Sequence, residues 1–304
     1  MTYRESYETG LAALTKAAVE EAETDARLLL EFVCGTDRNT LLAHGDREVT
    51  AEQEGVYREL LEKRSARIPL QYLTGVQNFM GLDFAVNRHV LIPRQDTEIL
   101  VEEAMKELHD GMEVLDLCTG SGCILISLLY YSNNCRGVGA DVSEEALRVA
   151  KENAGRLLGN RRAWGDPKMP GRLSEPLGEE TSETQVSFVR GDLFENVDGM
   201  FDMIVSNPPY IQSGVIDTLM PEVREHEPRV ALDGGGDGLL YYRRILAEVP
   251  RYLRRGGMLF FEIGYDQGEA VSRLMEESGF TEIRVIQDYG GLDRVVWGTL
   301  EFGA

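Results

Sequence analysis

The residues best suited to chemistry in this chain follow an apolar run at residues 201–205, and they are Asn207, Pro208, Pro209 and Tyr210. Such a run is typical of a buried parallel strand, and two prolines end it because neither can donate to a sheet. The turn is therefore expected at a strand's carboxyl end, where open α/β sheets bind ligands. The Asn207 side-chain oxygen and the Pro208 carbonyl are two fixed acceptors beside the ring of Tyr210, an arrangement that fits a planar NH₂ group.

Asparagine and proline are also common in turns that bind nothing. By themselves the four residues are equally compatible with a plain turn and with a ligand site. Motifs elsewhere in the chain must decide between the two interpretations.

A glycine turn upstream favours the ligand site. Residues 112–117 form a short apolar strand, a helical pattern begins near residue 123, and between them lie Cys118, Thr119, Gly120, Ser121 and Gly122. A strand, a glycine turn and a helix N-terminus let a ligand approach backbone N–H groups closely. The dinucleotide fingerprint would require glycine at position 125, which is Leu125 here, so an NAD-dependent dehydrogenase is disfavoured. The turn indicates another nucleotide-like cofactor.

An acidic residue follows the next predicted strand. Residues 136–140 are expected to form this strand, and it ends on Asp141, roughly 20 residues past the glycine turn. A carboxylate in this place accepts hydrogen bonds from ribose hydroxyls. The alternative is that Asp141 only caps the turn before a helix that starts at Ser143. Because the glycine turn precedes it, we favour the ribose role.

The rest of the chain predicts the elements that position these residues. Residues 1 to about 75 show helical spacing, including a helix over 51–67 with Thr50 as its cap and Gln53 three residues later. Alternation over residues 77–90 predicts a β-hairpin. A helix is expected to open at Asp96 and Glu98, whose acids complement its dipole rather than take part in catalysis. From residue 112 onward, strands alternate with helices, which predicts a mostly parallel sheet with helices on both faces.

The remaining segments complete this prediction. After Tyr210, residues 211–236 are expected to be a long loop with a short helical piece. Residues 280–287 and 294–300 should form a closing antiparallel pair, because no helix separates them. Residues from about 159 to 184 are rich in glycine, proline and charge, and we interpret them as an exposed insertion that need not be ordered.

Composition narrows the possible partners and location. The 304 residues include 52 acidic and 31 basic side chains, for a formal net charge of -21, and such a surface repels nucleic-acid phosphates. The four cysteines form no C-x-x-C pair and the four histidines are scattered, so neither a disulfide framework nor a metal site is expected. No signal peptide or membrane span is evident. These features favour the reducing cytoplasm.

With these motifs in hand, the chain resembles a known family. The glycine turn, Asp141, the Asp192-Leu193-Phe194 stretch and the Asn-Pro-Pro-Tyr turn resemble class I S-adenosylmethionine-dependent methyltransferases. The Leu91-Ile92-Pro93-Arg94 stretch and residues 227–232 narrow the resemblance to release factor glutamine methyltransferases of the HemK/PrmC type. Two departures are Cys118, where the family usually has glycine, and Gln95-Asp96 in place of Pro-Glu.

The resemblance implies a fold and an activity. Residues 76–304 would comprise the hairpin linker and a domain with a seven-stranded, mostly parallel Rossmann-like methyltransferase sheet. A helical substrate-recognition domain at residues 1–75 would precede them. The activity would be methyl transfer from S-adenosylmethionine to the glutamine side chain in the Gly-Gly-Gln motif of class 1 release factors. An enzyme that methylates adenine amino groups in nucleic acid remains an alternative, because adenine also presents a planar NH₂. A module that binds the cofactor without catalysis is a further alternative, although it gives no reason for Asn207.

By the same resemblance, the site residues take separate roles. Asn207, Pro208 and Tyr210 would be catalytic and, with Pro209, would hold the glutamine substrate. The expected cofactor contacts are Cys118, Thr119, Gly120, Ser121, Gly122, Asp141, Asp192, Leu193 and Asn207.

Overall fold

The computed structural model describes residues 1–159 and 186–301, and the chain divides into two compact units. The helical unit consists of Met1–Val76 and Thr218–Glu227, and the sheet unit consists of Gln77–Asp217 and Pro228–Ala304. The insertion predicted at about 159 to 184 lies, except for its first residue, outside the described residues. None of the described helices is both long and apolar enough to cross a membrane.

The helical unit is a small bundle around its own apolar core. Its helices are α1 (Tyr3–Lys16), α2 (Ala22–Cys34), α3 (Arg38–Ala43), α4 (Ala51–Ser65), α5 (Leu70–Thr74) and α9 (Pro221–His226). The predicted cap of α4 is confirmed: Thr50 accepts from the Gln53 backbone, and the Gln53 side chain accepts from the Thr50 backbone. The core forms where Leu14, Leu29 and Leu30 pack against the buried ring of Tyr57.

A buried ion cluster explains why a short segment from late in the chain belongs to this unit. Arg64 Nε lies 2.6 Å from Asp25 Oδ2, and Arg64 Nη1 lies 2.9 Å from Glu222 Oε1. Arg67 Nη2 reaches the other Glu222 oxygen at 2.7 Å. Because α9 carries Glu222, these pairs fasten it to α4 and to the loop after it.

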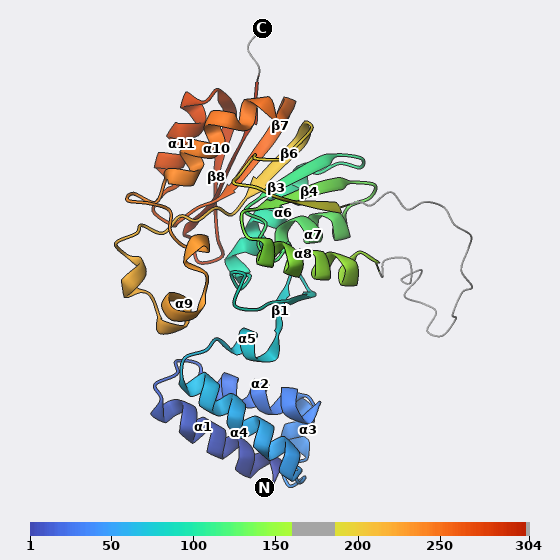
Figure 1. Ribbon diagram of the computed structural model, residues 1–304, viewed down its shortest axis with the longest axis vertical. Coiled ribbons are helices and arrows are strands. Elements are labelled where there is room, and N and C mark those ends of the chain that lie inside the picture. The colour runs from blue at the N-terminus through green and yellow to red at the C-terminus, as the bar shows by residue number, and fades with distance from the viewer. Residues whose placement is uncertain (160–185, 302–304) are drawn as a thin grey trace, which may run out of the picture. The chain divides into compact units, whose positions relative to one another are not determined.

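The sheet unit is built on seven strands in the order β5-β4-β3-β6-β7-β9-β8 (Figure 1). Their bounds are β3 (Glu113–Leu117), β4 (Arg136–Asp141), β5 (Val186–Arg190), β6 (Phe201–Ser206), β7 (Leu253–Glu262), β8 (Phe280–Gln287) and β9 (Asp293–Leu300). The first five strands of that order pair in parallel, and β9 pairs antiparallel with both β7 and β8. The mostly parallel Rossmann-like sheet and its antiparallel closing pair are therefore confirmed.

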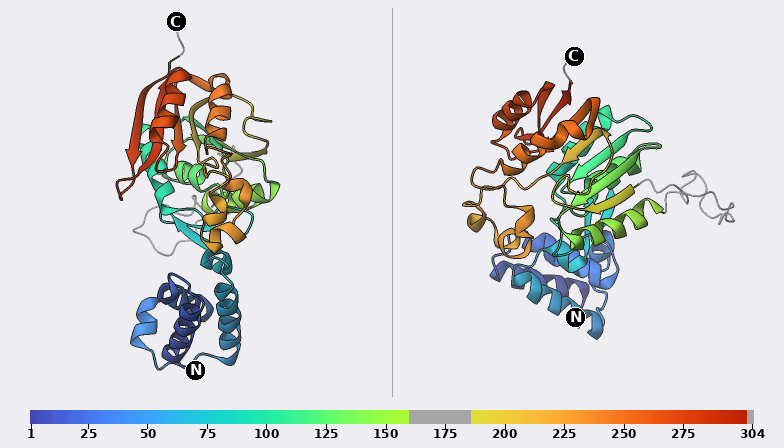
Figure 2. Two further views of the ribbon diagram at one scale, coloured as in Figure 1. Left: turned by 90° about the vertical axis from the view of Figure 1, so that its left-hand side faces the viewer. Right: turned by 45° about the horizontal axis from the view of Figure 1, so that its top comes forward.

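Helices cover both faces of this sheet, as the alternating pattern predicted (Figures 1 and 2). Successive residues of a strand point to opposite faces. Accordingly, Val114 packs with α6 (Glu98–Glu107), α7 (Cys123–Tyr131) and the end of α8 (Glu144–Leu157), whereas Leu115 packs with α10 (Leu240–Glu248) and α11 (Gly268–Glu277). Two apolar layers therefore hold the strand ends in fixed places.

Shorter elements complete the unit. The predicted hairpin is β1 (Val76–Phe79) with β2 (Leu82–Ala85), and the helix expected to open at Asp96 begins as the 3₁₀ turn η1 (Gln95–Thr97) before α6. The loop after Tyr210 contains the 3₁₀ turns η3 (Ile216–Thr218) and η4 (Arg229–Ala231) on either side of α9, and η5 (Val249–Arg251) follows α10.

Candidate active site

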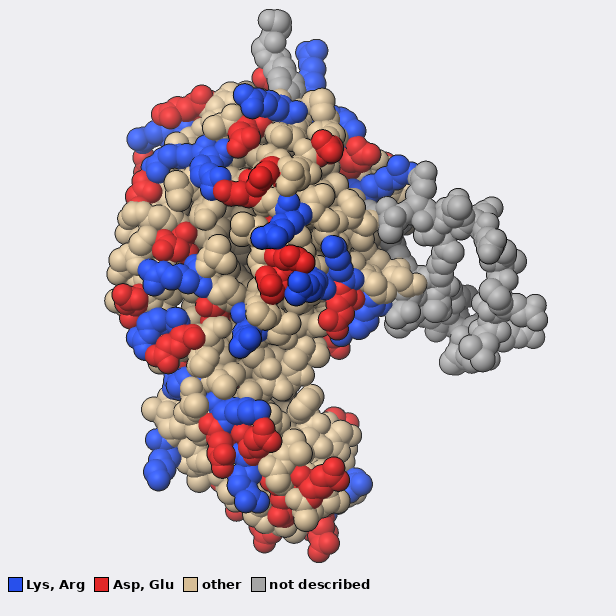
Figure 3. Space-filling model, in the orientation of Figure 1, with Lys and Arg blue, Asp and Glu red and all other residues tan. Residues whose placement is uncertain are grey.

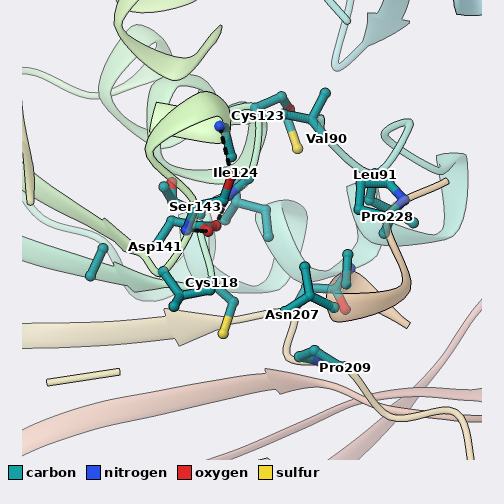
Figure 4. Close-up of a pocket in the computed structure, with 18 of the residues that line it drawn as sticks. Val90, Leu91, Cys118, Cys123, Ile124, Asp141, Ser143, Asn207, Pro209 and Pro228 are labelled. Atoms are coloured by element: carbon teal, nitrogen blue, oxygen red, sulfur yellow. Dashed lines mark hydrogen bonds between the residues drawn. The ribbon is translucent and has the colours of Figure 1, made fainter. Parts of the chain in front are cut away.

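A pocket opens at the carboxyl ends of β3, β4, β5 and β6 (Figure 4). The chain runs outward from β3 to β5 and then returns to β6 on the other side of β3, so the pocket lies at the point where strand order reverses. Eight of the predicted site residues line it together, beyond Asn207: Cys118, Thr119, Gly120, Ser121, Asp141, Asp192, Leu193 and Pro209.

The glycine turn forms the floor of this pocket. Gly122 has a φ of 79° and ends the turn at the N-terminus of α7, and a Cβ there would lie 2.8 Å from Ile126 Cδ1. Cys118 has a φ of 61°, a left-handed conformation that favours glycine. The Thr119 hydroxyl donates to Asp116 Oδ2 over 2.6 Å, which fixes the turn from below. The turn is therefore held in one conformation, with Gly122 packed closely against α7.

Asp141 bridges the glycine turn and the next helix. Its Oδ2 accepts from the Gly120 N–H over 2.9 Å, and its Oδ1 accepts from the Ser143 N–H over 2.9 Å. Burial raises the pKa of this carboxyl, while the backbone donors lower it. Each carboxylate oxygen can accept a second hydrogen bond. Asp141 therefore performs the capping role and still has acceptor capacity toward the pocket.

Asp192 and Leu193 form another wall. Leu193 is buried and has a φ of 58°, so its backbone is turned in a way that few non-glycine residues adopt. Asp192 is exposed, and its Oδ2 pairs with Arg244 Nη2 at 2.9 Å. The apolar side chain thus faces the interior while the acid lies at the rim.

In the described part of the chain, the Asn207 side chain is held through its NH₂ group and not through its carbonyl oxygen. Its Nδ2 lies 3.4 Å from Thr97 Oγ1, which fits donation of an amide hydrogen to the threonine. Within the described residues, neither Asn207 Oδ1 nor the Pro208 carbonyl accepts a hydrogen bond. Both acceptors that the sequence singled out are therefore unoccupied by these residues, and Asn207 is the one that lines the pocket.

Gly122, Pro208 and Tyr210 are not among the residues that line the pocket. Gly122 and Pro208 are buried, and each is adjacent in the chain to a residue that lines the pocket. The Tyr210 hydroxyl points to Glu262, donating to Oε1 over 3.3 Å, and the Tyr210 carbonyl accepts from Gln267 Nε2 over 3.1 Å. Hydrogen bonds therefore hold both the hydroxyl and the backbone carbonyl of Tyr210, and its hydroxyl points away from the pocket.

Thr97 and Glu262 were not predicted from the sequence. The two acids beside Thr97 are engaged elsewhere: Asp96 pairs with Arg294, and Glu98 accepts from the Met80 N–H. Glu262 could have been found by the rule that identified Asp141, because it is also an acid at the carboxyl end of an apolar strand.

The sheet order and the pocket at its switch point define a Rossmann-like α/β fold, and a family-model match places it among the methyltransferases. Residues 108–160 match a methyltransferase-domain family model, and residues 5–75 match the PrmC N-terminal domain. A methyltransferase structure from Pyrococcus furiosus, 19% identical, covers 79% of this chain and 100% of that chain with a TM-score of 0.53, which shows the shared fold.

Relatives narrow this class to one family. The chain is 41% identical to the release factor glutamine methyltransferase of Caulobacter vibrioides over 94% of this chain and 92% of that protein. It is 40% identical to that of Geobacter sulfurreducens over 94% of this chain and 93% of that protein. The chain therefore belongs to the release factor glutamine methyltransferase family.

Proposed function

We propose that this protein transfers a methyl group from S-adenosylmethionine to the side-chain nitrogen (N5) of the glutamine in the Gly-Gly-Gln motif of class 1 release factors. The observation that carries the proposal is the pair of acceptors at the end of β6. Asn207 Oδ1 and the Pro208 carbonyl accept no hydrogen bond within the described residues. Asn207 lines the pocket of the glycine turn, and Pro208 lies in the chain between Asn207 and Pro209, which both line it.

The pocket residues fit the proposed cofactor. Asp141 has spare acceptor capacity for ribose hydroxyls. Leu193, Val142 and Ile124 provide apolar surface that suits a base. The turn from Cys118 to Gly122 would hold the remainder, with Asp192 at the rim. When bound, S-adenosylmethionine supplies a methyl group that its sulfonium has already activated.

The role of the turn is to orient a weak nucleophile. The lone pair of an amide nitrogen is delocalised into its carbonyl, so the nitrogen attacks only when that lone pair is aimed correctly. Acceptance of the two N–H hydrogens by Asn207 Oδ1 and the Pro208 carbonyl fixes the amide plane. Positioning of reactants can lower a barrier by roughly 7–11 kcal/mol, whereas an ordinary hydrogen bond contributes about 1 kcal/mol net. Orientation is therefore the larger contribution.

The proposed reaction needs no oxidant or reductant. A nitrogen–carbon bond would form as the sulfur–carbon bond of the methyl donor breaks, and water would take the proton that the nitrogen then loses. The Asn207 and Pro208 oxygens accept hydrogen bonds before and during this step and are unchanged at its end.

We propose a protein substrate, met through the helical unit, rather than nucleic acid. The net charge is -21, and Figure 3 shows Lys and Arg interspersed with Asp and Glu on the face of the sheet unit in view. A negative net charge of this size opposes steering of a phosphate backbone toward the protein. The four free cysteines are compatible with a reducing compartment, and we place the protein in the cytoplasm.

The proposal is tested by mass spectrometry of a purified release factor after incubation with labelled S-adenosylmethionine. The label should appear on the Gly-Gly-Gln glutamine and be absent when that glutamine is replaced by alanine. Asn207→Ala should abolish single-turnover transfer and change cofactor affinity much less. Asn78→Ala, at an exposed asparagine in the hairpin, is the matched control. Near-normal transfer by folded Asn207→Ala would contradict the orientation mechanism.

A further inference from the structure

Glu262 is a buried acid behind the Asn-Pro-Pro-Tyr turn, and it is only 2% exposed. It ends β7, and its Oε1 accepts from the Tyr210 hydroxyl over 3.3 Å. The Thr97 hydroxyl lies near enough to this carboxylate to lower its pKa. Oε2 has no hydrogen-bond partner within residues 1–159 and 186–301, so this buried oxygen has unused acceptor capacity. The Glu262 carboxylate therefore lies next to Thr97, which contacts the first residue of the turn, Asn207, and it bonds to the last residue, Tyr210.

The direction of these hydrogen bonds follows from charge. An ionised carboxylate can only accept, and bonds to it are stronger than bonds between neutral groups. An ionised Glu262 would therefore draw the Thr97 hydrogen, which would leave a lone pair of Thr97 Oγ1 facing Asn207. Only the NH₂ end of the Asn207 amide can donate to that lone pair, at the observed 3.4 Å.

We propose that Glu262 is a positioning residue that sets which way round the Asn207 amide lies. Its carboxylate takes the Thr97 hydrogen, Thr97 takes an Asn207 amide hydrogen, and Asn207 Oδ1 is left facing the substrate. Through Tyr210 the same carboxylate also fixes the far end of the turn. This inference rests on the proposed function, because it explains how Asn207 is oriented for that reaction.

The relay depends on ionised Glu262. If Glu262 were protonated, its O–H would donate to Thr97, and the Thr97 hydrogen would then be free for Asn207 Oδ1. The Asn207 amide would turn over and present N–H hydrogens to a substrate that also presents N–H hydrogens. A neutral residue at position 262 should therefore impair transfer even when the fold is intact.

The surroundings place this ionisation within an accessible pH range. Burial raises the pKa of Glu262 to about 7, although Thr97, Arg294 and Tyr210 each lower it. The ionisable groups that face it from the surrounding elements are Tyr210, Asp96, Arg294, Tyr242 and Cys123. Of these, Arg294 is the cation, and Asp96 opposes its effect.

The primary test compares wild type with Glu262→Gln, which keeps the shape and removes the charge. We expect single-turnover methyl transfer to fall by up to about 100-fold, with cofactor affinity nearly unchanged and with stability at pH 8 equal or higher. The wild-type rate should rise with pH toward a plateau above pH 7, and the variant should lack this rise. A variant with the wild-type rate and pH profile would overturn the proposal, as would one that loses stability and cofactor affinity along with activity.

A second comparison isolates the hydroxyl of Thr97. Thr97→Val removes the hydroxyl at similar volume and should slow transfer, whereas Thr97→Ser keeps the hydroxyl and should retain most of the rate. In the Glu262→Gln background, Thr97→Val should cost much less than in wild type, because the relay is already broken. Equal costs in the two backgrounds would contradict the relay. Absence of transfer by the wild-type protein would instead contradict the proposed function, so the two failures are distinguishable.

Discussion

Gly120 donates its backbone N–H to Asp141 Oδ2 over 2.9 Å, so the glycine turn and the carboxyl end of β4 are joined by a single carboxylate. The other Asp141 oxygen accepts from Ser143 at the start of α8. The residue proposed to bind ribose therefore also shapes the pocket that receives it. Its replacement should affect binding through both routes.

Asp141→Ala should weaken S-adenosylmethionine binding markedly. Hydrogen bonds to a charged group contribute about 1.5–3 kcal/mol each, and about 1.4 kcal/mol corresponds to a tenfold change in affinity. We expect a loss of at least about tenfold by calorimetry. Asp237→Ala, which removes an exposed acid that pairs with Arg243 outside the pocket, is the control. Unchanged affinity in Asp141→Ala would remove Asp141 from the site.

Substitutions at Cys118 should depend on backbone conformation more than on side-chain chemistry. A left-handed conformation costs an L-residue roughly 1–2 kcal/mol, and it is worse for a β-branched side chain. Cys118→Val should therefore lower the free energy of unfolding by at least about 1 kcal/mol, whereas Cys118→Gly should change it by less than about 1 kcal/mol. Cys123→Val is the matched control in urea titrations, because Cys123 lies in the α-helix α7 and its backbone is not left-handed. Equal effects of valine at positions 118 and 123 would contradict this explanation.

Glu262 should make stability depend on pH. Its pKa is raised from 4.5 to about 7 in the folded protein, mainly by burial. The folded state therefore holds a proton that the unfolded state releases, so the stabilisation from this group is full below pH 4.5 and is lost as pH rises through about 7. Glu262→Gln stays neutral, so its free energy of unfolding relative to wild type should increase from pH 5 to pH 8 by about 1 kcal/mol or more.

Urea titrations at several pH values measure this difference. Asp116, another buried acid with a pKa raised to about 7 by burial, is present in both proteins and cancels. A difference that stays flat over this range, or that falls with pH, would show that Glu262 is ionised throughout.

The choice between protein and nucleic acid is tested by competition. Purified release factor, DNA and RNA should be offered together at one salt concentration, because binding to nucleic acid depends steeply on salt. We expect label on the Gly-Gly-Gln glutamine to dominate, and Asn207→Ala to label none of the three. Preferential labelling of adenine would overturn the substrate assignment and leave the methyltransferase class intact.

The sequence by itself determined the parts of this protein that depend on local pattern. Strand and helix spacing, the glycine turn and the paired prolines are properties of consecutive residues, and the sheet they predicted is the one observed. The pocket also followed, because parallel strands place their carboxyl ends at one edge, which brings Cys118, Asp141, Asp192 and Asn207 together.

Tertiary structure decided the contacts between segments that are distant in the chain. Thr97 reaches Asn207 from 110 positions away, and Tyr210 reaches Glu262 across 52 positions. Glu222 joins the helical unit because buried Arg64 and Arg67 pair with it. Burial makes such polar partners necessary, since an unpaired buried charge is costly. Which partner satisfies each group depends on how the elements pack, and no local pattern in the sequence records that.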